Sequence, residues 1–221
     1  NIFLNNLHNL EVLKKREFNF SDCSIMNCIY AGAFLHLNRD FSKTVKYLSN
    51  LFDIKKNILP NNNENLKLIA LRKNGEVLMT ESDIVNLRSN VEIKKVFLIK
   101  YEFNIDQKII NKLNFNDKIK YLDKLNVSFN LSESVKKIIK DSDIIIFAPG
   151  TQHSSLLPTY MSCSLGDIIA DNKQCFKVFV SNIGADYENP VYIASDYINN
   201  AFKYLSYSSK HSYSINDFFN L

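Results

Sequence analysis

The segment that most constrains the fold of this chain runs from Asp141 to Pro158. It begins with an apolar, largely β-branched run at 144–148, which is typical of a parallel strand covered by helices on both faces. Gly150 follows, where glycine permits a tight turn or the close approach of another backbone. Three hydroxyl side chains come next, where the free N–H groups of a helix N-terminus collect: Thr151, Ser154 and Ser155. This order predicts a phosphate-binding loop at the carboxyl end of a strand in an open α/β sheet.

The rest of the chain alternates between helical and extended patterns. A helix is predicted from about Ser24 to Leu37, capped by Ser21 or Asp22, and another after Asp40. Two more helices are predicted over Leu131–Lys140, where Asn130 and Glu133 have a capping-box-like spacing, and over Ile193–Ser206. Further strands are predicted over Val96–Ile99 and Phe176–Val180. The Asn74-Gly75 pair between two apolar segments predicts a β-hairpin. Strands and helices that alternate at these lengths imply right-handed βαβ crossovers. We therefore predict an α/β, Rossmann-like three-layer fold with a mostly parallel sheet, plus a β-hairpin and an inserted segment.

The length of 221 residues and the hydrophobic content of 46% fit one domain over residues 1–221. Residues 101–130 are rich in Lys and Asn without a clear period, and we expect them to be an insertion with some local structure. The chain starts at Asn1 without a Met and stops at Leu221 inside an amphipathic pattern. We therefore expect it to be truncated at both ends.

Charge and cysteine usage argue against several classes of protein. The net charge is +4, but the lysines are spread along the chain, so we expect no nucleic-acid partner. No apolar run approaches the roughly 18 residues of a membrane span, and no signal-peptide pattern is present. The four cysteines contain no C-x-x-C pair, so we expect free thiols in a cytoplasmic protein and no zinc: Cys23, Cys28, Cys163 and Cys175.

A series of short motifs, taken in order, resembles one protein family. The motifs are Phe18-Asn-Phe-Ser-Asp-Cys-Ser-Ile-Met-Asn27, Asp40-Phe41 at a helix start, Ile58-Leu-Pro60, the hairpin ending in Thr80-Glu81, Ala148-Pro-Gly-Thr-Gln-His-Ser-Ser-Leu-Leu-Pro158, Val180-Ser-Asn182 and Ala194-Ser-Asp196. From Phe18 onward the chain resembles the CofD/YvcK family, which includes 2-phospho-L-lactate transferase and the gluconeogenesis-factor proteins. The resemblance implies a Rossmann-like fold and a nucleotide-containing ligand: a guanosine-linked phospholactate in the transferase branch, or a UDP-sugar in the regulatory branch.

The same resemblance implies particular site residues. Asn27 matches the Asn of a Ser-Ile-Gly-Asn motif whose helix start faces the ligand. The loop that holds nucleotide or phosphate is matched by Gly150, Thr151, Ser154 and Ser155. Asn182 matches an Asn at a strand end that faces the same crevice. Asp196 matches the Asp of Ala-Ser-Asp, which we expect to cap or orient more than to react.

Several of these residues also have an ordinary structural interpretation. Gly150 and Thr151 could form a simple turn with the serines as helix caps, and Asn27 could only cap its helix. His153 lies within the loop, and its imidazole could donate to a phosphate or act as an acid near its usual pKa of about 6.5. A capping or surface histidine is the alternative. We do not expect His153 and Ser154 to form a base and nucleophile, because neighbouring residues rarely align in this way.

The chain also departs from the family pattern. Met26 stands where the family usually has glycine, and Asp22 and Cys23 replace a common Gly-His pair. Thr80 replaces a glycine that commonly precedes the glutamate. The family's glycine-rich turn and acidic Asp-Asp-Gly-Gly loop are absent, because this chain begins after them. These departures put close ligand approach at the first helix in doubt and remove the expected position for a magnesium ligand or base.

Two functions remain open from the sequence. The first is a nucleotide or nucleotide-sugar binding protein that holds phosphate at the Gly150 loop. The alternative is an enzyme like 2-phospho-L-lactate transferase, which moves a phospho-linked group from a nucleoside-diphosphate donor to an acceptor hydroxyl by positioning and electrostatics. We favour the first, because the Gln152-His153-Ser154-Ser155 run departs from the pattern expected in the transferase branch, whose acceptor is a deazaflavin. Mg²⁺ would accompany the nucleotide, no protein-held metal is predicted, and a homodimer and fusion to further domains stay open.

Overall fold

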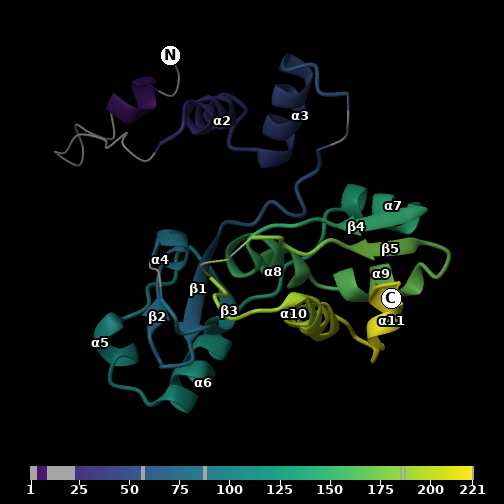
Figure 1. The fold of residues 1–221 in the computed structure, drawn as a ribbon. Coiled ribbons are helices and arrows are strands. Elements are labelled where there is room, and N and C mark those ends of the chain that lie inside the picture. The colour runs from purple at the N-terminus through teal and green to yellow at the C-terminus, as the bar shows by residue number, and fades with distance from the viewer. Residues whose placement is uncertain are drawn as a thin grey trace. The chain divides into compact units, whose positions relative to one another are not determined.

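The computed structural model describes residues 4–8, 23–55, 58–86, 89–184, 186 and 188–220. The chain divides into two compact units, Asn1–Asn63 and Glu64–Leu221 (Figure 1). Within the described ranges, no helix combines the length and the apolar character needed to cross a membrane.

The N-terminal unit contains two helices in contact, α2 (Ile25–His36) and α3 (Phe41–Leu51). The N-cap of α2 is Ser24, whose Oγ accepts the Asn27 N–H at 3.1 Å. The predicted caps at 21 and 22 lie outside the described residues. Asp40 begins α3 as predicted, because its Oδ1 accepts the Lys43 N–H at 2.9 Å.

The larger unit contains a three-stranded antiparallel sheet in the order β2-β1-β3. Its strands are β1 (Leu66–Arg72), β2 (Val77–Leu78) and β3 (Ile93–Lys100), and the short helix α4 (Glu81–Asn86) follows β2. The predicted hairpin at Asn74-Gly75 is confirmed, since β1 and β2 pair antiparallel and Gly75 has φ +87°. Glycine adopts this backbone conformation without the steric cost that other residues meet.

A separate two-stranded sheet carries the parallel pairing. Strands β4 (Ile144–Phe147) and β5 (Phe176–Phe179) pair in parallel register. Between them run a π-helix, η1 (Gln152–Leu156), and the helices α8 (Leu157–Tyr160) and α9 (Leu165–Asp171). The mixed α/β class is therefore confirmed. A mostly parallel sheet is not, because the longer strands β1 and β3 pair antiparallel.

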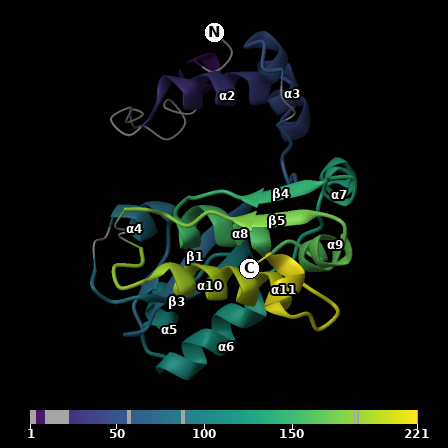
Figure 2. The same cartoon turned by 45° about the vertical axis from the view of Figure 1, so that its right-hand side comes forward.

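Within the Glu64–Leu221 unit, helices cover one face of β4 and not both faces as predicted. Ile144 and Ile146 are 58% and 62% exposed, and Phe176 on β5 is 56% exposed. The other face carries Ile145 and Phe147, which pack into the main core. Figure 2 shows α8 and α9 on this same side of the pair. An apolar run therefore marks the strand but does not tell whether one face or both are covered.

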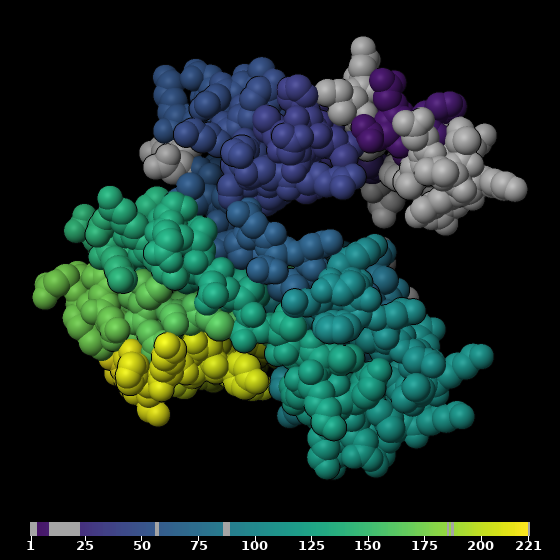
Figure 3. Space-filling view, turned by 180° about the vertical axis from the view of Figure 1, so that it is seen from behind, coloured from purple at the N-terminus to yellow at the C-terminus, as the bar shows by residue number. Residues whose placement is uncertain are grey.

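The antiparallel sheet is the one with both faces covered. Ala70, Val96 and Leu98 join the main core, which extends to α8, α9, α10 (Ala194–Tyr207) and α11 (Ile215–Phe218). Alternate residues of the same strands face a second cluster with α5 (Gln107–Ile110) and α6 (Phe115–Leu125). Residues 101–130 thus supply the helical layer on the second face, and their teal surface is seen in Figure 3.

Two more of the predicted helices, α7 and α10, are confirmed with small changes of boundary. Helix α7 spans Glu133–Lys140 and begins after Ser132, not at the Asn130 cap suggested by the sequence. Helix α10 begins at Ala194, where Asp196 accepts the Ile193 N–H at 2.9 Å.

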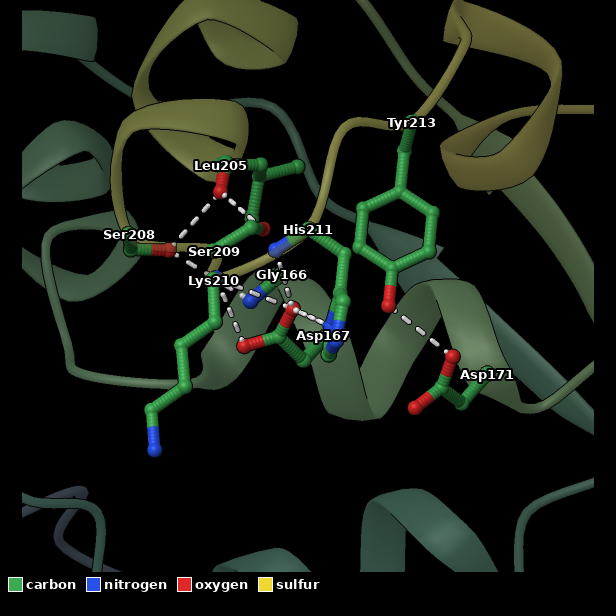
Figure 4. Close-up of polar contacts among 9 residues, drawn as sticks. All are labelled: Gly166, Asp167, Asp171, Leu205, Ser208, Ser209, Lys210, His211 and Tyr213. Carbon is green, nitrogen blue, oxygen red and sulfur yellow. Dashed lines mark hydrogen bonds and ion pairs between the residues drawn. The ribbon is translucent and has the colours of Figure 1, made fainter.

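The segment after α10 is fixed to α9 by a buried carboxylate (Figure 4). Asp167 accepts the Lys210 N–H at 3.0 Å and the His211 N–H at 3.4 Å, and His211 Nδ1 lies 3.3 Å from Oδ1. Beside it, Gly166 allows close approach: an added Cβ would lie 2.0 Å from Ser209 Oγ and 2.3 Å from the Leu205 carbonyl oxygen. We call this contact between α9 and residues 208–213 the Asp167 joint.

Candidate functional site

The loop at residues 150–156, here called the Gly150 loop, follows the carboxyl end of β4 and is held by Asn182, which lies shortly after β5. The Gly150 N–H donates to Asn182 Oδ1 at 2.8 Å, and Asn182 Nδ2 donates to the Gly150 carbonyl oxygen at 2.9 Å. The two strands are parallel, so their carboxyl ends meet at one edge of the sheet. The structure therefore brings together Gly150 and Asn182, which sequence reasoning placed in the same crevice.

Gly150 itself is not required by backbone conformation. Among the described glycines only Gly75 has a positive φ, so the tight-turn reason for glycine at 150 does not hold. A Cβ built at Gly150 would approach nothing nearer than the Leu156 side chain, at 3.4 Å, which is close to ordinary contact. A methyl group at this position would lie in van der Waals contact with the Leu156 side chain.

The loop continues as one π-helical turn whose hydroxyl groups form a connected row. The Thr151 carbonyl oxygen accepts both the Ser155 N–H at 3.1 Å and the Leu156 N–H at 3.2 Å. Thr151 Oγ1 lies 2.8 Å from Ser155 Oγ and 2.9 Å from Ser154 Oγ. Because Thr151 and Ser155 are exposed, these hydroxyls can meet a ligand. Single π-helical turns are rare and recur at functional sites.

A carboxylate already occupies the N–H groups that the sequence assigned to phosphate. Glu188 Oε2 accepts the His153 N–H at 2.8 Å and the Ser154 N–H at 3.2 Å, and Glu188 Oε1 accepts the Ser154 hydroxyl. Glu188 is only 4% exposed. Sequence reasoning missed this residue, which lies 34 positions beyond Ser154. The signal that could have found it is the pair of acids, Asp186 and Glu188, shortly after the strand end at Asn182.

Burial raises the pKa of Glu188, while the Ser154 and His153 donors offset part of this effect and the negative charge of Asp186 adds to it. Asp186 accepts the Glu188 N–H and an Asn189 side-chain N–H, each at 2.9 Å, so it is fixed beside Glu188. Among the residues the structure describes, no cationic side chain forms an ion pair with Glu188. Within the described residues, the loop thus holds this carboxyl group through backbone N–H and hydroxyl donors.

The ring of His153 lies in the interior, away from the surface row of hydroxyls. It is 1% exposed and packs edge-to-face on Tyr192, with ring centroids 6.3 Å apart. Burial, with a smaller effect of Lys203, lowers the pKa of His153 to about 3, so the imidazole is neutral near pH 7. The structure places it as a packing residue, a position that neither sequence interpretation anticipated. Whether it contacts a ligand stays a prediction.

A second missed residue, Gln152, connects the Gly150 loop to α10. It is fully buried, and its Nε2 donates to the Tyr197 carbonyl oxygen at 2.7 Å. Its Oε1 accepts from Asn200 Nδ2 at 3.0 Å. These bonds satisfy the buried amide and fix the loop from behind.

The remaining two predicted residues take no part in the hydrogen bonds of the Gly150 loop described above. Asp196 caps α10 through the Ile193 N–H, in line with an orienting role. Asn27 is an exposed residue in the first turn of α2, within the N-terminal unit. Its contact with a ligand at the Gly150 loop stays a prediction. Over the described ranges, no three His, Cys, Asp or Glu side chains are grouped closely enough to hold a metal ion.

The sequence model of the family described as "2-phospho-L-lactate transferase CofD" matches residues 15–217. This chain belongs to the CofD family. It is also similar to two curated proteins named "Putative gluconeogenesis factor". The protein from Thermotoga maritima is 25% identical over 193 residues, which cover 87% of this chain and 52% of that protein. The protein from Clostridium acetobutylicum is 26% identical over 188 residues, which cover 83% of this chain and 36% of that protein.

A solved structure of this fold is known from Bacillus halodurans, where it is described as a member of the UPF0052 family. It superposes with a TM-score of 0.64 at 21% identity and covers 91% of this chain and 57% of that one. The likeness supports the α/β fold. The chain spans about half, or less, of the length of the curated relatives that it matches.

Proposed function

We propose that this chain binds a nucleotide or nucleotide sugar, with the phosphate at the Gly150 loop. The observation that supports this most directly is the carboxylate of Glu188 on the N–H groups of His153 and Ser154. Backbone N–H groups at the start of a helical turn favour any anion, and a phosphate offers more acceptor oxygens than a carboxylate. Family membership in CofD agrees with a nucleotide-related ligand.

In this proposal the ligand phosphate displaces Glu188. The raised pKa of Glu188 means that its charged form is less stable here than in water, which favours exchange for a better-matched anion. After exchange, the hydroxyls of Thr151, Ser154 and Ser155 would donate to the outer phosphate oxygens. Asn182 keeps the loop in shape through both of its bonds to Gly150.

Magnesium fits this proposal only as an ion carried by the nucleotide. Asp186 is the acid nearest to Glu188, and both of its oxygens already accept hydrogen bonds within the segment. The described residues therefore offer no ready set of oxygen ligands for a protein-held ion. Mg²⁺ is commonly bound through one or two carboxylates together with substrate phosphates.

Transfer of a phospho-linked group is the second candidate, and the description of the matching family favours it. The acceptor hydroxyl oxygen would form a bond to phosphorus, the diphosphate P–O bond would break, and a nucleoside monophosphate would leave. The Gly150 loop would hold the donor phosphates in line for this attack. Such a reaction depends on positioning and charge stabilisation, so it needs no protein nucleophile.

Calorimetric titration with UDP-N-acetylglucosamine, GDP and GTP tests the binding proposal. Gly150→Ala is the informative variant, because its methyl fits the free protein, with Leu156 at 3.4 Å. In our proposal the same methyl keeps a phosphate from approaching the backbone at this position. We expect at least a tenfold loss of affinity. Gly184→Ala is the matched control, because no atom lies within 4 Å of its added Cβ. Equal affinities of Gly150→Ala and the wild type would exclude phosphate binding at this loop.

Glu188→Gln tests the displacement step, because it keeps the shape of the side chain and removes the competing charge. We expect nucleotide affinity to rise about tenfold, or about 1.4 kcal/mol. Lower affinity in this variant would instead make Glu188 a ligand contact. Uridine selectivity would favour the sugar-nucleotide role, and guanosine selectivity with release of a nucleoside monophosphate would favour the transferase.

A further inference from the structure

Two cavities lie along one face of α10 and meet at Lys203. The first, of about 440 Å³, is lined by residues that include Lys73, Glu92, Tyr192, Asp196 and Asn200. The second, of about 480 Å³, is lined by residues that include Val96, Asn126, Met161, Tyr204 and Tyr207. On α10 the lining positions 196, 200, 203 and 207 recur every three or four residues, so they share one face. We call the two cavities together the α10 groove.

The two halves of the α10 groove differ in chemistry. In the first half Lys73 and Glu92 form an ion pair at 2.5 Å, which leaves a polar but largely balanced wall. The second half is mostly apolar, with Val96, Met161 and Tyr204 buried in its wall and Tyr207 67% exposed. Sites for small molecules commonly have volumes of about 300–1,000 Å³ and combine apolar walls with a few polar groups.

The aromatic wall is held in place by the edge of the antiparallel sheet. The Val96 N–H of β3 donates to the Tyr204 hydroxyl oxygen at 3.1 Å, which fixes this ring against the strand. The Lys95 ammonium lies 5.6 Å from the Tyr207 ring centroid. The same ammonium forms an ion pair with Asp123 at 2.6 Å. A rigid ring beside an accessible one favours a planar ligand, since aromatic groups pack best in offset or edge-to-face arrangements.

Lys203 carries the charge that the groove does not balance. Its neighbours Lys73 and Lys95 each have an acidic partner, but within the described parts of the chain no carboxylate lies in ion-pair range of Lys203. Partial burial and the positive charges of Lys94 and Lys95 lower the pKa of Lys203. An anion placed between the two cavities would relieve this repulsion.

We propose that the α10 groove binds a small anionic molecule with a planar apolar part. The anion pairs with the Lys203 ammonium, and the planar part packs between Met161, Tyr204 and Tyr207. This site shares no residue with the Gly150 loop. It therefore stands whether or not that loop binds a nucleotide.

The test compares 2-naphthoate with 2-naphthamide, two probes of the same planar shape of which only the first is charged. Titrations followed by ¹H–¹⁵N NMR give both affinity and location. We expect naphthoate to bind at least tenfold more tightly than naphthamide, with the largest shifts at Tyr204 and Tyr207 in the second cavity. Equal affinities, or shifts centred on the Gly150 loop, would overturn the proposal.

Lys203→Gln should abolish the preference for naphthoate, while Tyr207→Ala should weaken both probes severalfold. Lys120→Gln on α6 is the matched control, because Lys120 is also solvent-exposed, with 76% of its side chain accessible, and lies outside the groove. Circular dichroism and the melting temperature verify that each variant is folded. A preference for naphthoate that persists in folded Lys203→Gln would refute the role of this lysine.

Discussion

Asp167 and Glu188 are buried carboxylates that each accept two backbone N–H groups, yet their surroundings shift their pKa values in opposite directions. Asp167 and Glu188 are 7% and 4% exposed. Burial alone would raise the pKa of Asp167, but the N–H groups of Lys210 and His211 and the His211 ring outweigh it and lower the pKa. Glu188 also receives two N–H groups, but burial, and to a lesser extent the negative charge of Asp186, raises its pKa. Within the described residues no cationic side chain pairs with it to offset this.

The two carboxylates therefore have different roles. Asp167 fixes the segment at 208–213, whereas Glu188 occupies N–H groups that another anion can take. The N–H donors at Asp167 come from the segment that it anchors, so loss of the carboxylate leaves that segment without its partner. The donors at Glu188 belong to a loop that Asn182 and Gln152 hold independently. Another anion can therefore satisfy them without loss of the loop's shape.

The largest effect is expected when the Asp167 joint is broken sterically. Gly166→Ala would place a methyl group 2.3 Å from the Leu205 carbonyl oxygen and 2.0 Å from Ser209 Oγ, so α9 and the end of α10 must move apart. We expect a loss of about 3 kcal/mol in the free energy of unfolding, measured with urea. Gly150→Ala should cost less than about 1 kcal/mol. Equal losses in the two variants would show that the close approach at Gly166 is relaxed in solution.

Removal of charge at each carboxylate gives the next largest contrast. Asp167→Asn turns an amide N–H toward backbone donors and should cost about 2 kcal/mol. In Glu188→Gln the amide oxygen can accept both N–H groups while the amide nitrogen donates to Ser154 Oγ, so stability should change by less than about 1 kcal/mol. Urea unfolding of both variants at pH 7 measures the difference. A larger loss of stability in Glu188→Gln than in Asp167→Asn would mean that Glu188 is the carboxylate that fixes its segment.

The pH dependence of stability should also have opposite signs at the two sites. The lowered pKa of Asp167 gives stability that is present above its unfolded value of 3.8 and lost as the pH falls through the folded value. The raised pKa of Glu188 gives a contribution to folding stability that is present below its unfolded pKa of 4.5 and is lost as the pH rises through its folded pKa.

From about pH 7 toward pH 4, the wild type should therefore gain stability relative to Glu188→Gln. Its advantage over Asp167→Asn should persist until the pH falls to about 4 and then shrink. Urea midpoints of the three proteins over this range measure both trends. Parallel curves for the two variants would mean that the carboxylates titrate alike.

The sequence predicted local structure well because the signals are local. Asp40 caps α3 within one turn, and Asn74-Gly75 determines its hairpin through the φ of a single glycine. The apolar runs of β4 and β5 were also found. Sheet order was not, because an apolar strand can pair in either direction and with one or both faces covered.

The candidate site was predicted only in part for a related reason. The Gly150 loop and Asn182 follow from the rule that ligand loops leave the carboxyl ends of parallel strands. Glu188 and Gln152 did not, because each acts through contacts with residues more than 30 positions away. The interior position of His153 likewise depends on Tyr192, which packs against it only in the folded chain.

The smallest effect is expected when only the His211 ring is removed, which separates its contribution at Asp167 from that of the backbone N–H groups. His211→Ala removes the contact between Nδ1 and Asp167 but keeps the N–H groups of Lys210 and His211 on the carboxylate. The His211 side chain is 72% exposed, and exposed ion pairs contribute little because water screens them. We expect a loss of less than about 0.5 kcal/mol by urea unfolding at pH 7. A loss as large as that of Asp167→Asn would mean that the His211 ring, and not the backbone N–H groups, holds the Asp167 joint.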